Sequence, residues 1–167
     1  GVVLSIIVGY IRKGKLSNFE NIEVRAWYLL ILSQMSQIIA IRFNGTFFNM
    51  NETVFYAVHI LSYIILLIPI LVNYRLLSMK LLGCGAIINL IPIALNHGQM
   101  PVYLPEGANA SFDMGHVLAS SSTKAYLLAD IIPVMKPYPL PKIISIGDIF
   151  LFIGVFLFIQ YGMSNRD

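Results

Sequence analysis

Apolar runs alternate with short charged stretches along this chain, and this alternation predicts membrane-spanning helices. A helix that crosses a bilayer needs about 20 predominantly apolar residues. The clearest such run, residues 53–74, lies between Glu52 and Arg75, and charged residues bound the other runs in the same way. The pattern predicts about five helices, over residues 1–12, 25–42, 53–75, 79–96 and 146–163. We therefore expect an all-α fold, a single transmembrane domain built as a helical bundle.

Composition supports a membrane protein. Of the 167 residues 57% are hydrophobic and 11% are charged, whereas soluble domains carry about a quarter charged residues. The formal net charge is +3, and the basic residues do not alternate with aromatic ones, so no nucleic-acid partner is expected. Because Cys84 is the only cysteine, an intramolecular disulfide and a cysteine metal site are excluded.

The first apolar run, Val2 to Ile11, is short for a spanning helix, and its charges follow it instead of preceding it. This order is not that of a secretory signal. We expect the run to be the surviving end of a first transmembrane helix.

Lysine and arginine near helix ends predict the orientation, because cytoplasmic connections are enriched in them. If the first connection is cytoplasmic, residues 97–145 lie outside and the C-terminus lies in the cytoplasm of a multi-pass cell-membrane protein. The cytoplasmic side then receives Arg12, Lys13, Lys15, Arg25, Arg75, Lys80 and Arg166, and the outer side receives Arg42, Lys124, Lys136 and Lys142.

Residues 97–145 form a long connection between the fourth and fifth predicted helices, and long loops in compact proteins are often functional. The run STKAYLLADIIP predicts a short helix from about Thr123 to Asp130. We expect a structured extracytoplasmic segment, called here the outer segment, that packs against the bundle.

Several polar residues lie inside the predicted helices: Gln34, Gln37, His59 and Asn89. Polar groups in hydrocarbon need partners and therefore face the bundle interior. For Asn89 an interhelical hydrogen bond is the simpler interpretation, and for His59 a buried hydrogen bond. Ser33, Gln34, Ser36 and Gln37 indicate either a polar seam between helices or the lining of a hydrophilic cavity.

Further candidates gather in the outer segment and beside it. Asn96 and His97 end the fourth predicted helix, and His116 follows in the outer segment. Ser145 and Asp148 have capping-box spacing at the start of the last helix. A carboxylate at the end of the predicted helix, Asp130, opposes the helix dipole and should have a tertiary partner. We expect Asn96, Asp130 and Asp148 to approach one another.

The spacing of these histidines and carboxylates matches no zinc pattern such as HExxH, and phosphate loops, dinucleotide fingerprints and nucleophile elbows are absent from the sequence. The sequence therefore predicts no metal site and no cofactor.

Three blocks, NHGQMPV, HVLASSSTKAYLLADIIP and ISIGDIFLFIG, resemble an uncharacterised family of small bacterial integral membrane proteins, a domain of unknown function found mostly in Gram-positive bacteria. The family's Asn-Gly-Gly-x-Met-Pro stretch is matched here at Asn96, Gly98, Met100 and Pro101, with His97 in place of a glycine. The resemblance extends to His116, Thr123, Asp130, Pro133, Ser145, Gly147 and Asp148. It implies a membrane fold and no activity.

The sequence favours a polar pocket at the outer membrane face that binds or handles a polar small molecule or a lipid head group, with transport as one such handling. The expected ligand-binding residues are Asn96, His97, Met100, His116, Thr123, Asp130, Ser145 and Asp148. Two alternatives stay open: a membrane-embedded enzyme that uses His116 with Asp130 or Asp148, and a subunit whose polar seams meet a membrane-protein partner.

Overall fold

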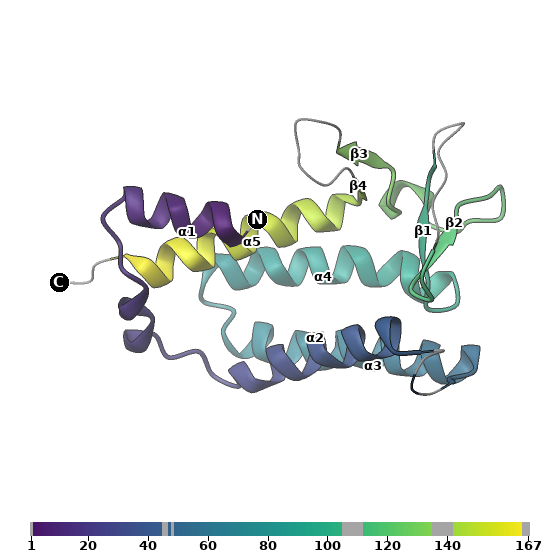
Figure 1. Ribbon diagram of the computed structural model, residues 1–167, viewed down its shortest axis with the longest axis horizontal. Helices are drawn as coiled ribbons and strands as arrows, with labels where there is room; N and C mark the ends of the chain where they lie inside the picture. Colours follow the sequence, from purple (N-terminus) through teal and green to yellow (C-terminus); the bar gives the residue numbers. More distant parts are fainter. Residues whose placement is uncertain (1, 45–46, 48, 105–111, 135–141, 165–167) are drawn as a thin grey trace.

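A bundle of helices with a small β region at one end is formed by the residues that the computed structural model describes, which are 2–44, 47, 49–104, 112–134 and 142–164 (Figure 1). The helices begin and end within a few residues of the predicted ranges. They are α1 (Val2–Ile11), α2 (Trp27–Arg42), α3 (Glu52–Val72), α4 (Leu77–Leu95) and α5 (Ile146–Met163), and the 3₁₀ helix η1 (Leu16–Asn21) follows α1. Lys136 and Arg166, used for the predicted orientation, lie outside the described residues.

The expectation of an all-α fold is wrong, because the outer segment contains strands. Strand β1 (Met100–Val102) pairs in parallel with β2 (His116–Leu118), and β3 (Ile132–Val134) pairs antiparallel with β4 (Lys142–Ile144). Met100 and Ile132 each precede a proline, and the residue before proline is sterically restricted to extended conformations. The fold is mostly helical, with this small sheet region added.

The short helix predicted from Thr123 to Asp130 is also corrected. A single 3₁₀ turn, η2 (Tyr126–Leu128), stands in its place, preceded by Ala125 in the left-handed conformation with φ 54°. Asp130 lies in extended backbone, where it forms a parallel bridge with Val102. Asp130 therefore does not face the C-terminal dipole of a helix, and its partners must be sought in the tertiary structure.

Three helices in the described part of the chain, α3, α4 and α5, are long and apolar enough to cross a membrane. With 10 and 16 residues, α1 and α2 are shorter than the roughly 20 residues of a straight span. Large apolar side chains such as Leu61 and Leu71 on α3 are more than half exposed. Such faces suit contact with lipid.

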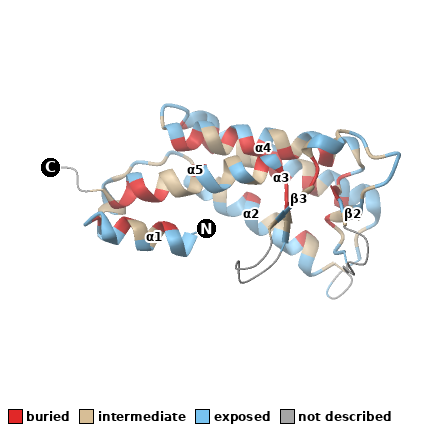
Figure 2. Ribbon diagram, turned by 90° about the horizontal axis from the view of Figure 1, so that it is seen from above, coloured by how far each residue is buried: buried red, intermediate tan, exposed pale blue. Residues whose placement is uncertain are grey.

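Helix α4 lies at the centre of the bundle, between α3 and α5, while α2 packs on α3 and α1 packs on α5 (Figure 1). Buried positions follow the faces where helices meet, and exposed ones cover the outside (Figure 2). Glycines bring α4 and α5 together: a Cβ at Gly85 would lie 2.7 Å from the carbonyl oxygen of Gly147, and one at Gly154 would lie 2.8 Å from Cγ of Leu82. Small residues permit such close approach of two backbones.

The chain order places four helix ends beside the β region. There α2 and α4 end, and α3 and α5 begin (Figure 1). Polar residues from distant parts of the sequence meet at this end.

Candidate functional site

A cavity of about 190 Å³ lies at the end of the bundle that carries the β region. Helices α2, α3 and α4 contribute Gln37, Ile41, His59, Tyr63, Asn89 and Ile93 to its lining. The outer segment and α5 contribute Met100, Gly115, His116, Asp130 and Asp148. The cavity therefore collects polar residues that lie more than a hundred positions apart in the sequence.

Asn89 joins α4 to the start of α5. Its Nδ2 donates to Oδ1 of Asp148 at 2.9 Å, and its Oδ1 accepts from Oγ of Ser145 at 2.7 Å. Ser145 is the N-cap of α5, where its Oγ accepts from the backbone N–H of Asp148 at 3.0 Å. The interhelical hydrogen bond expected for Asn89 is present, and so is the cap expected for Ser145. The first turn of α5 favours a negative charge, so Asp148 is stabilised both locally and by Asn89.

His59 is a buried hydrogen-bonding histidine on the α3 side of the cavity. Its side chain is 4% exposed, and its Nδ1 lies 2.7 Å from the backbone carbonyl of Gly98. Its ring also contacts the rings of Phe55 and Tyr63. This bond ties the start of α3 to the turn that follows α4.

Asp130 is 7% exposed and is fixed by its backbone. Its N–H donates to the carbonyl of Pro101, and its carbonyl accepts from Tyr103. The carboxylate oxygen Oδ1, by contrast, is buried and has no hydrogen-bond partner within the described ranges. Burial raises the pKa of Asp130 to about 7, the charge of Asp148 adds to this shift, and His116 and Lys142 act in the opposite direction.

The polar residues of α2 differ in their environments. Ser33 and Ser36 donate to carbonyls one turn earlier in their own helix, whereas Gln34 is exposed. Gln37 lines the cavity, and its buried Nε2 finds no acceptor in the described part of the chain. The cavity interpretation therefore applies to Gln37, whereas the two serines bond within their own helix and form no seam with another helix.

His116 lines the cavity, but its closest carboxylate is neither Asp130 nor Asp148. Its Nδ1 lies 2.6 Å from Oδ1 of Asp113, which also accepts from the backbone N–H of Gly115. A carboxylate that orients an imidazole is a known arrangement for general bases. However, no Ser, Thr or Cys is among the residues described as lining the cavity, so a hydroxyl or thiol nucleophile of the Ser–His or Cys–His kind is not among them.

Asn96 does not meet Asp130 and Asp148 as expected. Its Nδ2 donates to the carbonyl of Lys124 at 2.9 Å, and its Oδ1 accepts from the N–H of Lys124 at 3.1 Å. Asn96 therefore fastens the outer segment to the end of α4, outside the cavity lining. Of the three residues, the structure brings only Asp130 and Asp148 into the lining of one cavity.

The three remaining residues of the expected ligand-binding set, Met100, His97 and Thr123, do not lie together. Met100 is 6% exposed and lines the cavity, whereas His97 is exposed with φ 56°. This left-handed conformation is easiest for glycine, so histidine at this position carries some backbone strain. Thr123 accepts from the N–H of Ser120 through Oγ1 and so stabilises a turn.

Tyr63, which lines the cavity, and Asp113, which bonds to His116, belong to neither the expected ligand-binding residues nor the expected intramembrane polar residues. Tyr63 lies one helical turn after His59 and shares its face, a spacing that is visible in the sequence. Asp113 lies three residues before His116, and no local pattern distinguished it as the partner over Asp130 or Asp148.

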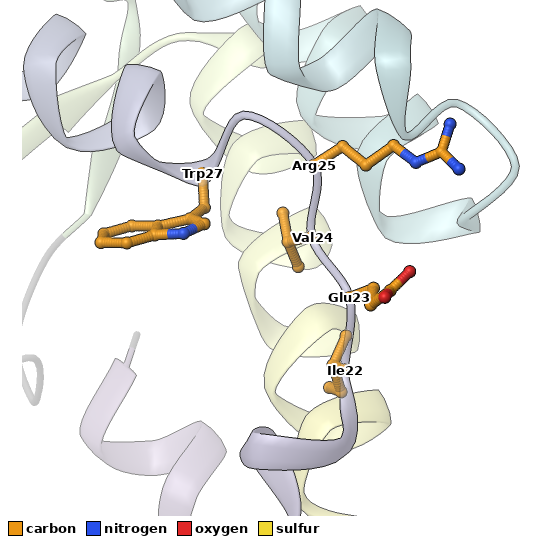
Figure 3. Close-up of a pocket in the computed structure, with 5 residues that line it drawn as sticks. All are labelled: Ile22, Glu23, Val24, Arg25 and Trp27. Atoms are coloured by element: carbon orange, nitrogen blue, oxygen red, sulfur yellow. The ribbon is translucent and has the colours of Figure 1, made fainter.

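A larger hollow of about 730 Å³ lies elsewhere, along the connection between η1 and α2. Figure 3 shows its lining, in which Trp27 and Arg25 point to opposite sides of the chain. Its side chains do not converge on a common point, so the smaller polar cavity is the better candidate.

Metal binding finds no support in the described residues, where no three His, Cys, Asp or Glu side chains gather as ligands.

Residues 21–160 match the model of a family of unknown function, DUF5317. The chain belongs to this family. It is 37% identical over 100 residues to an uncharacterized protein from Thermotoga maritima, a match that covers 59% of this chain and 60% of that relative. The matched region thus spans about three fifths of the relative's length. No solved structure matches the chain.

Proposed function

We propose that this protein is a multi-pass membrane protein whose cavity opens toward the outer face and binds a small polar ligand or a lipid head group. One observation carries the proposal. Gln37 Nε2, a donor, and Asp130 Oδ1, an acceptor, are both buried at the same cavity without partners among the described residues. A buried unsatisfied polar group typically costs about 1–3 kcal/mol. A ligand with both an acceptor and a donor would satisfy the two groups together.

Membrane insertion is supported by the apolar helices and also by the residues at the end of the bundle opposite the β region. Trp27, Tyr28 and Tyr74 are all more than half exposed, and they lie beside Arg25 and Arg75 in the sequence. Aromatic and basic residues are enriched where helices leave the hydrocarbon layer. We take this end as the cytoplasmic interface, which puts the cavity at the opposite face.

Labelling of introduced cysteines tests this orientation. Ser17 on the first connection and Ser121 in the outer segment are both exposed. In a Cys84→Ser background, we expect an impermeant thiol reagent to label Ser121→Cys in intact cells and Ser17→Cys only after lysis. Labelling of Ser17→Cys alone in intact cells would reverse the proposed orientation.

Native mass spectrometry of protein purified from its own membrane tests the binding function. We expect wild-type protein to carry a bound small molecule or lipid that is lost from the double variant Gln37→Leu, Asp130→Asn. The control Glu52→Gln removes an exposed carboxylate on α3 and should keep the bound molecule. Equal occupancy in the wild type and the double variant would contradict the proposal.

A second candidate function, lateral association with a partner helix, is favoured by Gln34, whose side chain is exposed on α2. An amide that faces hydrocarbon gains from a hydrogen bond to another helix. If this function holds, Gln34→Leu should weaken cross-linking to a membrane partner and leave ligand occupancy unchanged.

A further inference from the structure

The charges around the cavity are unbalanced. Two carboxylates, Asp130 and Asp148, line it, and the described lining contains no Lys or Arg. Asp148 is compensated by the Asn89 amide and by its place in the first turn of α5. Asp130 has neither form of compensation, and its buried Oδ1 lacks a partner in the described ranges.

The nearest basic groups are engaged elsewhere. Nζ of Lys142 lies 4.5 Å from the centre of the Phe152 ring, in a cation–π contact. The imidazole of His116 is held by Asp113 at 2.6 Å. Neither group forms a hydrogen bond to Asp130 Oδ1, so the cavity keeps an acceptor for a positively charged donor.

We propose that the ligand of this cavity is a small organic cation whose ammonium group binds Asp130 and whose hydrogen-bond acceptor binds the Gln37 amide. This inference rests on the proposed function and specifies its ligand class. The aromatic ring of Tyr63, which also lines the cavity, suits an organic cation because ammonium groups are attracted to aromatic faces. A metal cation fits less well, since the described residues offer no cluster of three ligand side chains.

An anionic group is disfavoured because it would meet two carboxylates in a partly buried space. The ammonium group of a free amine and that of an ethanolamine phospholipid share the required chemistry. Like-charge contacts at a binding surface are unfavourable, so the phosphate of such a lipid would have to remain outside the cavity.

Thermal unfolding in detergent, followed at fixed ionic strength against probe concentration, tests the inference. We expect ethylammonium and ethanolamine to raise Tm, and acetamide and inorganic phosphate to leave it unchanged. Asp130→Asn should weaken the apparent Kd of both amines by about 30-fold or more, as loss of one partner of a buried charge pair does. The control Glu52→Gln should bind both amines as the wild type does.

Gln37→Leu refines the test, because it removes the amide that would bind an acceptor on the ligand. We expect it to weaken ethanolamine, which carries a hydroxyl, and to leave ethylammonium unchanged. Equal losses for both amines would overturn the assigned role of Gln37.

Binding at different pH values provides a measurement that needs no variant. Because burial raises the pKa of Asp130 to about 7, amine binding should be lost as the pH falls from about 8 to 5. Other titratable or charged groups face this region from the neighbouring elements: His59 and Tyr63 of α3, His116 of β2, Asp113 before it, Lys142 of β4 and Asp148 of α5. Amine binding that is independent of pH would overturn the inference.

Two outcomes separate this inference from the proposed function. If phosphate or acetamide binds and the Gln37→Leu, Asp130→Asn variant abolishes that binding, the cavity binds ligands but the cation assignment is wrong. If none of the four probes binds and native mass spectrometry finds no molecule that depends on Gln37 and Asp130, both proposals fail.

Nanodiscs distinguish the two sources of the amine. In phosphatidylglycerol nanodiscs, we expect added ethanolamine to raise Tm. If a lipid head group is the ligand, phosphatidylethanolamine nanodiscs should abolish this increase; if a free amine is the ligand, the increase should persist. Either result supports ammonium recognition, and no response to ethanolamine in phosphatidylglycerol contradicts it.

Discussion

Asn89 links two helices through both ends of one amide group. It donates to Asp148 and accepts from Ser145, so its removal would leave a buried hydroxyl without an acceptor and a carboxylate without a donor. Because Asn89 is 3% exposed, water replaces these bonds poorly. A single residue in this position therefore affects both the start of α5 and the charge of the cavity.

We expect Asn89→Leu, which keeps a similar size and removes the amide, to destabilise the protein by about 1–3 kcal/mol. Thermal unfolding in detergent measures this. Cys84→Leu, an exposed change on the same helix, is the matched control and should have little effect. Equal stability of the two variants would show that the amide bonds contribute nothing measurable.

His97 and Gly98 have left-handed backbone conformations, with φ of 56° and 83°, yet their surroundings differ. His97 is exposed, whereas a Cβ at Gly98 would lie 2.9 Å from Cα of Tyr56. His97→Gly should therefore change stability by less than about 1 kcal/mol. Gly98→Ala should cost about 1–3 kcal/mol, because it adds backbone strain and a clash. Chemical unfolding of the two variants makes the comparison, and a tolerated Gly98→Ala would contradict it.

Helices α4 and α5 pack through glycines. The effect of adding a methyl group differs between Gly85 and Gly83, two glycines of α4. At Gly85 an added Cβ would meet the backbone of α5, at 2.7 Å from the Gly147 oxygen and 2.9 Å from the Leu151 nitrogen. At Gly83 it would meet only the Cγ2 methyl group of Ile70, 3.0 Å away. A side-chain methyl group can move by a few tenths of an ångström, whereas two backbones can separate only if the helices move apart.

We therefore expect Gly85→Ala to destabilise the bundle by about 1–3 kcal/mol through overpacking. Gly83→Ala should be close to neutral, since alanine is the better helix former by about 1 kcal/mol. Thermal unfolding of both variants in one detergent measures the difference. If Gly85→Ala proves as neutral as Gly83→Ala, α4 does not pack on α5 as described.

At the scale of the whole molecule, burial of Asp130 makes stability depend on pH. Its pKa rises from an ordinary 3.8 to about 7 on folding, so the folded state binds more protons than the unfolded state between these values. By linkage, the stability that protonated Asp130 contributes is full below about pH 4 and is lost as the pH rises to about 7. A cation bound at Asp130 would reverse this loss by stabilising the ionised form.

We expect Asp130→Asn, without added amine, to remove this dependence, so that the variant is more stable than the wild type above pH 7 and close to it below pH 4. Unfolding curves across this range, in wild type and variant, measure the effect. Parallel pH profiles would indicate that Asp130 does not titrate in the folded protein within this window.

The sequence by itself determined the helices, because the length of an apolar run and the charges that bound it are local features, and they suffice to define a spanning helix. It also determined the cap at Ser145, since Ser145 and Asp148 lie within one helical turn. The strands of the outer segment were not predictable in this way. They are three residues long, and each is stabilised by a partner distant in the chain, such as Met100 paired with His116.

The composition of the cavity was likewise decided by the tertiary structure. The sequence selected Gln37, His59, Asn89 and Asp130 as polar residues that need partners, but it did not say which of them would find one. Asn89 is satisfied because α4 and α5 approach at their glycines, and Asn96 because Lys124 folds back onto it. Gln37 and Asp130 face the space where α2 and the outer segment meet the bundle, and within the described residues Gln37 Nε2 and Asp130 Oδ1 remain unpaired. Hydrogen-bond satisfaction depends on distances of a few ångströms between separate segments, and packing alone sets these distances.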